Sequence, residues 1–451
     1  MEVGPLLHDA LTLLETGQVD GARQGMDLAL RATAQWPYDW RGWVALGKCA
    51  NFLREYIVAE HAFNRVLALC ELPMGRADGW LGLAIIQELY MNKTEAALGF
   101  AERARTELPD NAAPHLKCAD LLRDLHRWNA ADQYYTRALE LQPGWLEVRH
   151  NRSFLRFRQA RWRDAWRDYN CRWDSREFTN NVHGAPKSKP RWGGVALETR
   201  RLLVWMEQGF GDSLWGMRYV DVLLERHPQA QVILRVPQQL YRHIWINYRD
   251  RCTVLSNEDP LPEFDVHVPL LNLPVCLEQW EPFAGRPHHT EDGDAYPWDS
   301  ARKNIGIVWA GGPQFLYNAS RNTHLLDWEP VLALRDHNFV SLQIGTDAPE
   351  GQTLHDRGRL QDMRPLIKDF ADTANVLAGL DLIIGVDTSV LHLGSLLGVP
   401  TWWLLGDRVD WRWFPETPTT PWYPTARLWR KQLTESWRDV FTHVAAELGQ
   451  Q

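Results

Sequence analysis

Cysteine and long apolar runs are scarce in this sequence, and each shortage excludes a class of protein. The six cysteines among 451 residues show no Cys-x-x-Cys spacing, so we expect neither a zinc ribbon nor a disulfide framework. No window reaches the roughly 18 uncharged apolar residues that span a membrane. The first residues, MEVGPLLHDALTLLETG, lack the basic stretch and long apolar core of a signal peptide. These features predict a cytoplasmic, soluble protein with reduced cysteines.

Basic charge is also in short supply, because the formal net charge is −8. This balance argues against nucleic acid or an anionic membrane as the main partner. Neither Gly-Lys-(Ser/Thr) after the turn GFGD, nor His-Glu-x-x-His, nor Gly-x-Ser-x-Gly occurs. His288 and His289 lie in a loop-like segment, where we expect them to be solvated rather than to bind a metal. What is present is 45% apolar content over 451 residues, which predicts two or three globular units.

The first 177 residues repeat with a period near the ~34 residues of tetratricopeptide helix pairs. Small residues recur where two helices of a pair approach closely: Ala10, Gly47, Ala84, Ala119 and Ser153. An alanine recurs at the start of each second helix: Ala22, Ala59, Ala96, Ala131 and Ala165. Large side chains follow four positions later: Met26, Phe63, Phe100, Tyr135 and Tyr169. Prolines are predicted to close four of the units: Pro37, Pro73, Pro109 and Pro143.

The clearest unit runs from Ala112 to Gly144 and resembles the tetratricopeptide consensus. Helix pairs of this kind stack into a solenoid whose concave surface commonly binds an extended peptide. We therefore expect residues 1–177 to form an array of about five pairs that binds a protein partner or acceptor. The alternative is an array that only packs against the next domain. Residues 178–200 are rich in Gly, Pro, Lys and Asn and predict a linker.

From residue 201 onward, short β-rich runs alternate with helical patterns, which predicts parallel α/β modules. The first module, 201–300, contains RLLVWM, QVILRVP, CTVLS and FDVHVPL, with helices expected near 213–226 and 238–248. The second, 301–451, contains NIGIVWAGG, NFVSLQIG, LDLIIGVDTS and PTWWLLG, and ends in an amphipathic segment expected to cap or bridge the halves. Tandem modules of this kind usually bind a ligand between them, outside the carboxyl ends of the strands.

One strand of the second module runs directly into polar residues in IIGVDTSVLHLGSLLGVP, residues 383–400. Asp387, Thr388 and Ser389 precede a predicted helix, and His392 follows within its first turn. Unpaired N–H groups and hydroxyls at such a helix start suit a phosphate or diphosphate, to which His392 can also donate. The alternative is that Asp387 or Thr388 is only an N-cap and His392 a satisfied core residue.

The same string resembles the C-terminal nucleotide-sugar signature of the heptosyltransferase-like glycosyltransferases of family 9. That signature is Asp-Thr-(Gly/Ser), two residues, then His and a helix ending in Gly-x-Pro. The resemblance extends from about Trp192 to the C-terminus, and its nearest form is the bacterial proteins that join tetratricopeptide repeats to such an enzyme. These share EQGFGD, IGIVWAGG, VDTSVLHLGSLLGVP, DWRWF and PWYP. It implies a GT-B fold of two Rossmann-like domains and inverting sugar transfer from a nucleotide donor, without a bound metal or other cofactor.

The stretch EQGFGDSLWGMRYV, Glu207 to Val220, contains the acid that matches the proposed base of the family. By this resemblance Asp212 takes the acceptor proton, which is general-base work worth about 10² to 10⁴ in rate. Its glycines then make a tight turn that aims the carboxylate at the acceptor. The alternative is that Asp212 only caps a helix beginning near Ser213.

The leaving diphosphate gains negative charge, which must meet cations or N–H groups when no metal is bound. By resemblance Arg321 is that cation, since arginine suits the geometry of phosphate; a surface salt bridge is the alternative. Gly311 and Gly312 would permit close approach of the backbone to the donor. Gln343 and Gly345 follow another predicted strand and are expected nucleotide contacts.

Tryptophans crowd the stretch TWWLLGDRVDWRWFPETPTTPWYP. Aromatic faces stack on sugars and bases, but large aromatics more often fill cores. We expect most of them to be structural, with Trp411 and Trp413 as the cleft residues.

Together these patterns predict a glycosyltransferase whose repeats present a protein acceptor. Two other hypotheses remain open. One is a scaffold whose α/β part has lost turnover. The other is an enzyme acting on a glycan or lipid-linked acceptor, with repeats used for assembly only.

Overall fold

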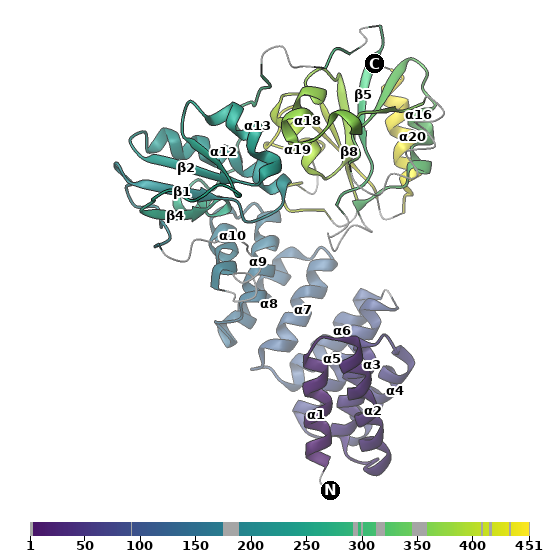
Figure 1. The fold of residues 1–451 in the computed structure, drawn as a ribbon. Helices are drawn as coiled ribbons and strands as arrows, with labels where there is room; N and C mark the ends of the chain where they lie inside the picture. Colours follow the sequence, from purple (N-terminus) through teal and green to yellow (C-terminus); the bar gives the residue numbers. More distant parts are fainter. Residues whose placement is uncertain are drawn as a thin grey trace. The chain divides into compact units, whose positions relative to one another are not determined.

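A computed structural model of the chain describes residues 3–91, 93–174, 189–291, 296–298, 301–312, 321–344, 359–406, 409–414, 417–432 and 434–450. The chain divides into two compact units, Met1–Arg172 and Trp173–Gln451. The first is built from helices and the second from helices and parallel sheets (Figure 1).

The helical unit consists of consecutive helix pairs joined by short turns (Figure 1). The pairs are α1 (Val3–Glu15) with α2 (Val19–Gln35), α3 (Trp40–Phe52) with α4 (Tyr56–Leu69), α5 (Pro73–Leu89) with α6 (Thr94–Glu107), α7 (Ala112–Asp124) with α8 (Trp128–Leu141), and α9 (Leu146–Arg158) with α10 (Trp162–Tyr169). A 3-10 turn, η1 (Asn170–Asp174), follows. Two of these helices have short polar N-caps. Asp39 caps α3 and Asn111 caps α7, each accepting a hydrogen bond from a backbone N–H group at 3.0 Å.

The repeat pattern of the sequence predicts most of the buried positions in this unit. The small residues expected between paired helices are buried, as are the alanines that open the second helices of four pairs. The third pair differs by one residue, since Ala96 is exposed and Ala97 is buried in its place. Three of the four prolines follow a helix end, whereas Pro73 is the first residue of α5, a position that needs no N–H donor.

Phe63 shows how small and large residues fit together between successive pairs. A Cβ at Gly47 would lie 2.8 Å from its ring, and a Cβ at Gly82 would overlap the opposite edge. The ring is 1% exposed, and burial of such a side chain contributes roughly 1.5–3 kcal/mol. Glycine on both sides therefore leaves room for the phenylalanine that joins these two pairs.

The first α/β module holds a four-stranded parallel sheet in the order β3-β2-β1-β4. Its elements are β1 (Arg201–Trp205), α12 (Phe210–Arg226), β2 (Gln231–Val236), α13 (Gln238–Tyr248), β3 (Thr253–Ser256), β4 (Val266–Pro269), η2 (Leu270–Asn272) and α14 (Leu273–Cys276). The end of the predicted linker adds to this sheet, because Arg191 forms a parallel bridge with His267 beside β4. The neighbouring Trp192 is buried.

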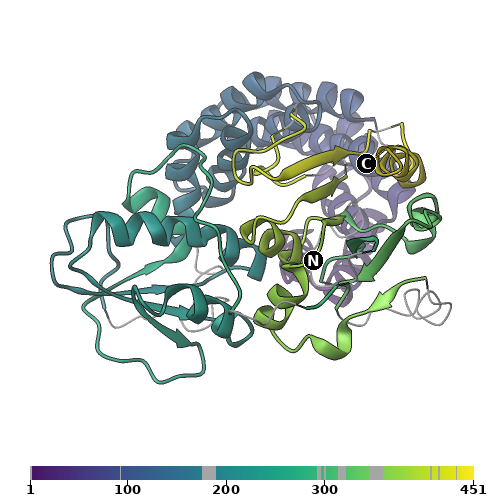
Figure 2. The same cartoon turned by 90° about the horizontal axis from the view of Figure 1, so that it is seen from above.

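The second α/β module holds a six-stranded parallel sheet in the order β10-β9-β8-β5-β6-β7. Its strands are β5 (Lys303–Val308), β6 (His337–Ser341), β7 (Gln361–Asp362), β8 (Leu382–Val386), β9 (Thr401–Leu405) and β10 (Ala426–Arg430). Its helices and turns are η3 (Leu325–Trp328), α16 (Glu329–Leu332), η4 (Arg364–Leu366), α18 (Phe370–Leu377), α19 (Ser389–Leu396) and α20 (Trp437–Leu448). The final helix, α20, lies beside α16 in both views (Figures 1 and 2), and Phe441 meets Trp328 at 4.3 Å between ring centroids.

The strand orders explain where a ligand site can form. Read from β7, the second sheet has the Rossmann order 3-2-1-4-5-6, and the first sheet has the order 3-2-1-4. In each sheet the direction of winding reverses between two central strands, which are β1 and β4 in the first and β5 and β8 in the second. Loops after these strands diverge and leave room for ligands. The fold class expected from the sequence, helical repeats followed by two Rossmann-like modules, is confirmed.

Candidate functional site

The loops after β5 and β8 hold most of the residues that the sequence singled out in the second module. Asp387 and Thr388 follow β8 directly, and Ser389 is the first residue of α19. The N-cap of α19 is Thr388, whose side chain makes no capping bond. Its hydroxyl oxygen is buried and has no hydrogen-bond partner in the described part of the chain. Asp387 is therefore not the N-cap, and the N-terminus of α19 keeps a hydroxyl available.

Asp387 is held by side chains from two other segments. The indole Nε1 of Trp413 donates to its Oδ2 at 2.7 Å, and Nε2 of His392 lies 3.5 Å from its Oδ1. Burial by itself would raise the pKa of Asp387, but the bonds from His392 and Trp413 outweigh burial and lower it. The carboxylate is thus kept ionised next to the start of α19.

His392 lies in the first turn of α19 and is 4% exposed. Its Nδ1 meets the hydroxyl of Tyr423 at 2.7 Å, while its Nε2 faces Asp387. Both ring nitrogens are therefore engaged within the protein. A donation from His392 to a phosphate, as the sequence suggests, would require Nε2 to turn from Asp387.

Arg321 lies against the loop after β5. Its Nη1 donates to the backbone oxygen of Asp387 at 3.0 Å, and a Cβ at Gly311 would overlap its guanidinium. Burial lowers the pKa of Arg321. Gly311 therefore makes room for the arginine, whereas a Cβ at Gly312 would meet no described atom within 4 Å. The guanidinium thus lies beside the residue that follows β8.

Gln343 follows β6 and is 4% exposed. Its Oε1 accepts from the backbone N–H groups of Trp309 and Ala310 at 3.2 and 3.0 Å. The amide therefore fixes the end of β5, next to the Gly311 loop. The other expected nucleotide contact, Gly345, lies outside the described residues.

Asp212 comes from the first module, in the first turn of α12 after β1. The helix begins at Phe210 with Gly209 as N-cap, so the alternative of Asp212 as an N-cap is wrong. Instead its Oδ1 accepts from Nη2 of Arg412, a residue of the second module. Its other oxygen, Oδ2, turns toward Gly209, where an added Cβ would lie 3.4 Å away.

Arg412 is the residue that sequence reasoning missed. Its side chain is 9% exposed, its Nη1 lies 3.0 Å from Oδ1 of Asp410, and burial raises the pKa of that carboxyl. The guanidinium carbon also lies 4.7 Å and 4.8 Å from the ring centroids of Trp215 and Trp411, within cation–π range. The string DWRWF contained this arginine, but nothing in the sequence paired it with Asp212.

The second glycine of GFGD has a packing role that the sequence did not indicate. Gly209 ends the short connection between β1 and α12 as the N-cap, whereas Gly211 lies inside α12 rather than in that turn. Neither glycine takes a left-handed conformation. A Cβ at Gly211 would lie 2.9 Å from Cδ2 of His392. The absence of a side chain therefore lets α12 approach α19, and it brings the two switch-point loops together.

Trp411 and Trp413 lie at this junction but do not present open faces. They are 5% and 1% exposed, and Trp413 packs against Trp403 with 4.2 Å between ring centroids. Neither ring is therefore open for stacking on a ligand. Trp413 instead supports the site by donating to Asp387. His288 also differs from expectation, because it is buried and bonds His243 at 2.9 Å rather than being solvated.

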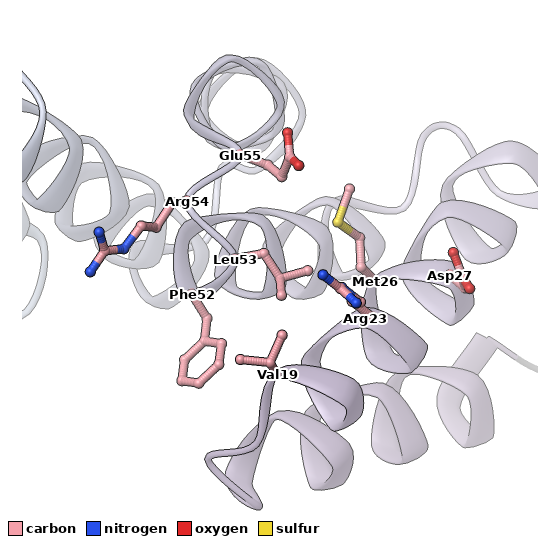
Figure 3. A pocket seen from close by; sticks show the side chains of 8 residues that line it. All are labelled: Val19, Arg23, Met26, Asp27, Phe52, Leu53, Arg54 and Glu55. Atoms are coloured by element: carbon pink, nitrogen blue, oxygen red, sulfur yellow. The ribbon is translucent and has the colours of Figure 1, made fainter.

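Two hollows in the described residues lie away from these groups. One, of about 420 Å³, lies between the start of α2 and the turn joining α3 to α4. Figure 3 shows its lining: Val19, Arg23, Met26, Asp27, Phe52, Leu53, Arg54 and Glu55. The other, of about 490 Å³, lies at the amino ends of β2 and β3, beside Trp245 and Arg249. Neither contains a predicted site residue.

No group of three or more His, Cys, Asp or Glu side chains with metal-binding geometry is found among the described residues. Within the same residues, no helix combines the length and apolar character needed to cross a membrane.

The fold and the site define a class: helical repeats of tetratricopeptide type, followed by two Rossmann-like modules whose switch-point loops meet. No family model matches the chain. It is similar to Protein FlbA of Caulobacter vibrioides, with 24% identity over 319 residues, which cover 63% of this chain and 52% of that protein. The chain thus spans about half the length of the curated relative that it matches.

Two solved structures are similar to parts of the chain. The E. coli ADP-heptose lipopolysaccharide heptosyltransferase II shows 14% identity and a TM-score of 0.41, covering 55% of this chain and 99% of its own. A thermophilic tetratricopeptide protein of Thermus thermophilus shows 19% identity and a TM-score of 0.32, covering 42% of this chain and 93% of its own.

Proposed function

We propose that the α/β unit is an inverting, metal-independent glycosyltransferase that uses a nucleotide-sugar donor in the cytoplasm. The observation that carries this proposal is the meeting of α12 and α19, which brings the Asp212 carboxylate close to a helix N-terminus with a free hydroxyl. Glycosyl transfer needs a base for the acceptor and an anion site for the leaving group. The two modules supply one of these each.

The donor diphosphate is assigned to the start of α19. Backbone N–H groups at a helix N-terminus and the helix dipole favour an anion there, and the Thr388 and Ser389 side chains add hydroxyls. Arg321 supplies the cation, since it already bonds the backbone of Asp387 one residue before Thr388. These groups would stabilise the charge that develops on the leaving diphosphate.

Asp212 is assigned as the base on the acceptor side. As the acceptor oxygen bonds to the anomeric carbon, the bond from that carbon to the diphosphate oxygen breaks, and the acceptor proton passes to Asp212. Arg412 binds Oδ1, so Oδ2 is the oxygen that would take the proton. Attack from the side opposite the leaving group inverts the anomeric carbon, which is consistent with base and anion site on different modules.

We infer that the acceptor is a protein bound by the helical unit. Stacked helix pairs form extended surfaces that commonly bind peptides. The first pairs of this unit carry exposed apolar side chains, including Tyr38 at 82% and Ile57 at 86% exposure. Such surfaces suit a protein acceptor better than a sugar chain.

Calorimetry with a panel of UDP-, GDP-, ADP-, CMP- and dTDP-sugars tests the proposal. We expect one nucleotide class to bind the wild-type protein and to bind Arg321→Gln at least about tenfold more weakly, because a bond from a charged group is lost. Arg438→Gln is the matched control, since this arginine of the same module pairs with Glu329 on the surface.

The result that contradicts the proposal is binding of no nucleotide-sugar by the wild-type protein. The α/β unit would then act as a scaffold without turnover. Equal binding by wild type and Arg321→Gln would instead show that the diphosphate lies elsewhere.

A further inference from the structure

A hydrogen bond connects His392 to Tyr423 in the loop between β9 and β10. The hydroxyl of Tyr423 and Nδ1 of His392 lie 2.7 Å apart. Tyr423 is 2% exposed, and its loop is fixed by an antiparallel bridge with Thr420 and by donation from the Ala426 N–H to the Tyr423 backbone oxygen at 3.0 Å. The hydroxyl is therefore held in place before any ligand binds.

The ring of His392 is enclosed on several sides. Trp403 meets it edge-on at 5.0 Å between centroids, and the centroid of the Trp413 ring lies 5.9 Å away. On the side of the first module, Gly211 leaves only enough room for Cδ2 and Nε2. The two nitrogens cannot exchange places without disturbing this packing, so each keeps its partner.

The partners on the two sides differ in what they can do. The Asp387 carboxylate beside Nε2 accepts hydrogen bonds, as it does from the Trp413 indole at 2.7 Å. A proton on Nδ1 alone would leave the lone pair of Nε2 facing this negative charge at 3.5 Å. A proton on Nε2 turns the same contact into an attraction.

The hydroxyl on the other side can donate. Burial raises the pKa of Tyr423 to about 12, so the hydroxyl keeps its proton near neutral pH. The guanidinium of Arg218 lies 5.0 Å from the centroid of the same ring, and a nearby cation makes a phenol a better donor. Arg218 itself is 1% exposed and donates to the backbone oxygens of Trp215 and Phe283.

We propose that Tyr423 is a positioning residue that donates to Nδ1 of His392 and so holds the ring proton on Nε2. The bond fixes the tautomer, because the nitrogen that accepts cannot also carry the proton. Nε2–H is then directed at Asp387 beside the N-terminus of α19. The value of this arrangement for donor binding rests on the proposed function, whereas the tautomer itself does not.

Nitrogen NMR of protein labelled with ¹⁵N-histidine tests the tautomer directly. In the wild-type protein we expect the His392 ring to show one protonated nitrogen, Nε2, and one unprotonated nitrogen, Nδ1. The His392→Gln variant identifies the signals by their disappearance. In Tyr423→Phe we expect the Nδ1 signal to shift from its wild-type position, because the hydroxyl that donates to this nitrogen is gone, while Asp387 still favours a proton on Nε2.

Tyr248→Phe is the matched control for this measurement. Tyr248 is also fully buried, and its hydroxyl donates to Asp221 at 3.2 Å within the first module. Its removal costs a similar buried hydrogen bond but should leave the His392 signals as in the wild type. The wild-type spectrum is decisive by itself, so the test does not depend on the stability of Tyr423→Phe.

Binding of UDP, GDP, ADP, CDP and dTDP, followed by calorimetry, gives the second readout. We expect Tyr423→Phe to bind the preferred nucleotide roughly tenfold more weakly than wild type, the scale of one hydrogen bond, and Tyr248→Phe to bind it equally well. A wild-type proton on Nδ1, protons on both nitrogens, or an unchanged Nδ1 signal in Tyr423→Phe would overturn the proposal. Failure of every nucleotide to bind wild type counts against the proposed function alone, because the NMR result stands without it.

Discussion

His243 in the first α/β module and His392 in the second are both buried histidines on helices that flank a parallel sheet. Burial lowers the pKa of His243 to about 3. Its Nε2 meets Nδ1 of His288 at 2.9 Å, and its Nδ1 has no hydrogen-bond partner in the described residues. His392 instead lies between the carboxylate of Asp387 and the hydroxyl of Tyr423.

The partners of the two histidines distinguish a residue that only packs in the core from one that has a role in a site. A histidine kept neutral by burial alone stabilises the fold only while it stays uncharged. A histidine with a carboxylate on one side and a hydroxyl on the other has a defined proton position. This arrangement is expected at sites that transfer protons or bind anions. The second module therefore concentrates fixed polar partners at its switch point, and the first module contributes Asp212 to the same place.

The largest expected effect comes from Asp212→Asn. If the first module supplies the base, loss of the ionisable carboxylate should lower kcat by about 10² to 10⁴ in a transfer assay with the donor found by calorimetry. Asp221→Asn is the control from the same helix, because Asp221 bonds Tyr248 and pairs with Arg251 away from the site. If Asp212→Asn transferred sugar at the wild-type rate, the assignment of Asp212 as the base would be wrong.

Removal of Arg412 should have the next largest effect, this time on stability. Arg412→Met leaves the partly buried carboxylates of Asp212 and Asp410 without their shared cation, which is expected to cost about 3 kcal/mol of unfolding free energy. Arg438→Met is the control, because its pair with Glu329 is 57% and 64% exposed and is worth less than about 1 kcal/mol. Chemical denaturation followed by tryptophan fluorescence measures both. Similar losses in the two variants would mean that the contact between modules adds little.

The sequence predicted the elements of both modules because their signals are local. Hydrophobic runs and turn residues place strands and helices to within a few positions, as for α13, which matches the expected 238–248 range. The start of α12 was placed too late, since the glycines of GFGD suggested a loop and the helix already begins at Phe210. In the repeats, the pattern placed the buried alanine of the third pair at residue 96 instead of residue 97. The error arose because the repeat length is not constant along the array.

The contacts that build the site could not be predicted in the same way. Asp212 and Arg412 are 200 residues apart in the chain, and no local pattern relates them. Gly211 was interpreted through its conformational freedom, whereas its role is to leave space for His392. The family resemblance pointed to Asp212 and Arg321, and the strand-to-helix pattern pointed to Asp387, but only the tertiary structure shows which side chains hold them.

Gly211→Ser tests the packing of α12 against α19, where the two modules touch. Serine is a better helix residue than glycine, yet its Cβ would lie 2.9 Å from Cδ2 of His392. We expect a net loss of about 1–3 kcal/mol from overpacking, measured by chemical denaturation. Gly209→Ser is the matched control, because Gly209 is the N-cap and its Cβ would meet only Asp212 at 3.4 Å. A stable Gly211→Ser protein with unchanged unfolding would show that α12 and α19 can separate at no cost.

The smallest expected effect is the dependence of stability on pH that His243 confers. Its pKa is about 3 in the folded protein against 6.5 for an ordinary histidine, so between these values the unfolded chain binds a proton that the folded chain does not. Stability should therefore fall as the pH drops below 6.5, by about 1 kcal/mol over the first unit. His243→Gln should flatten this decline, whereas the control His443→Gln, at an exposed position of α20, should leave it unchanged. Denaturation curves measured between about pH 7 and pH 5 decide the matter, since an equal decline in wild type and His243→Gln would mean that burial does not hold this histidine neutral.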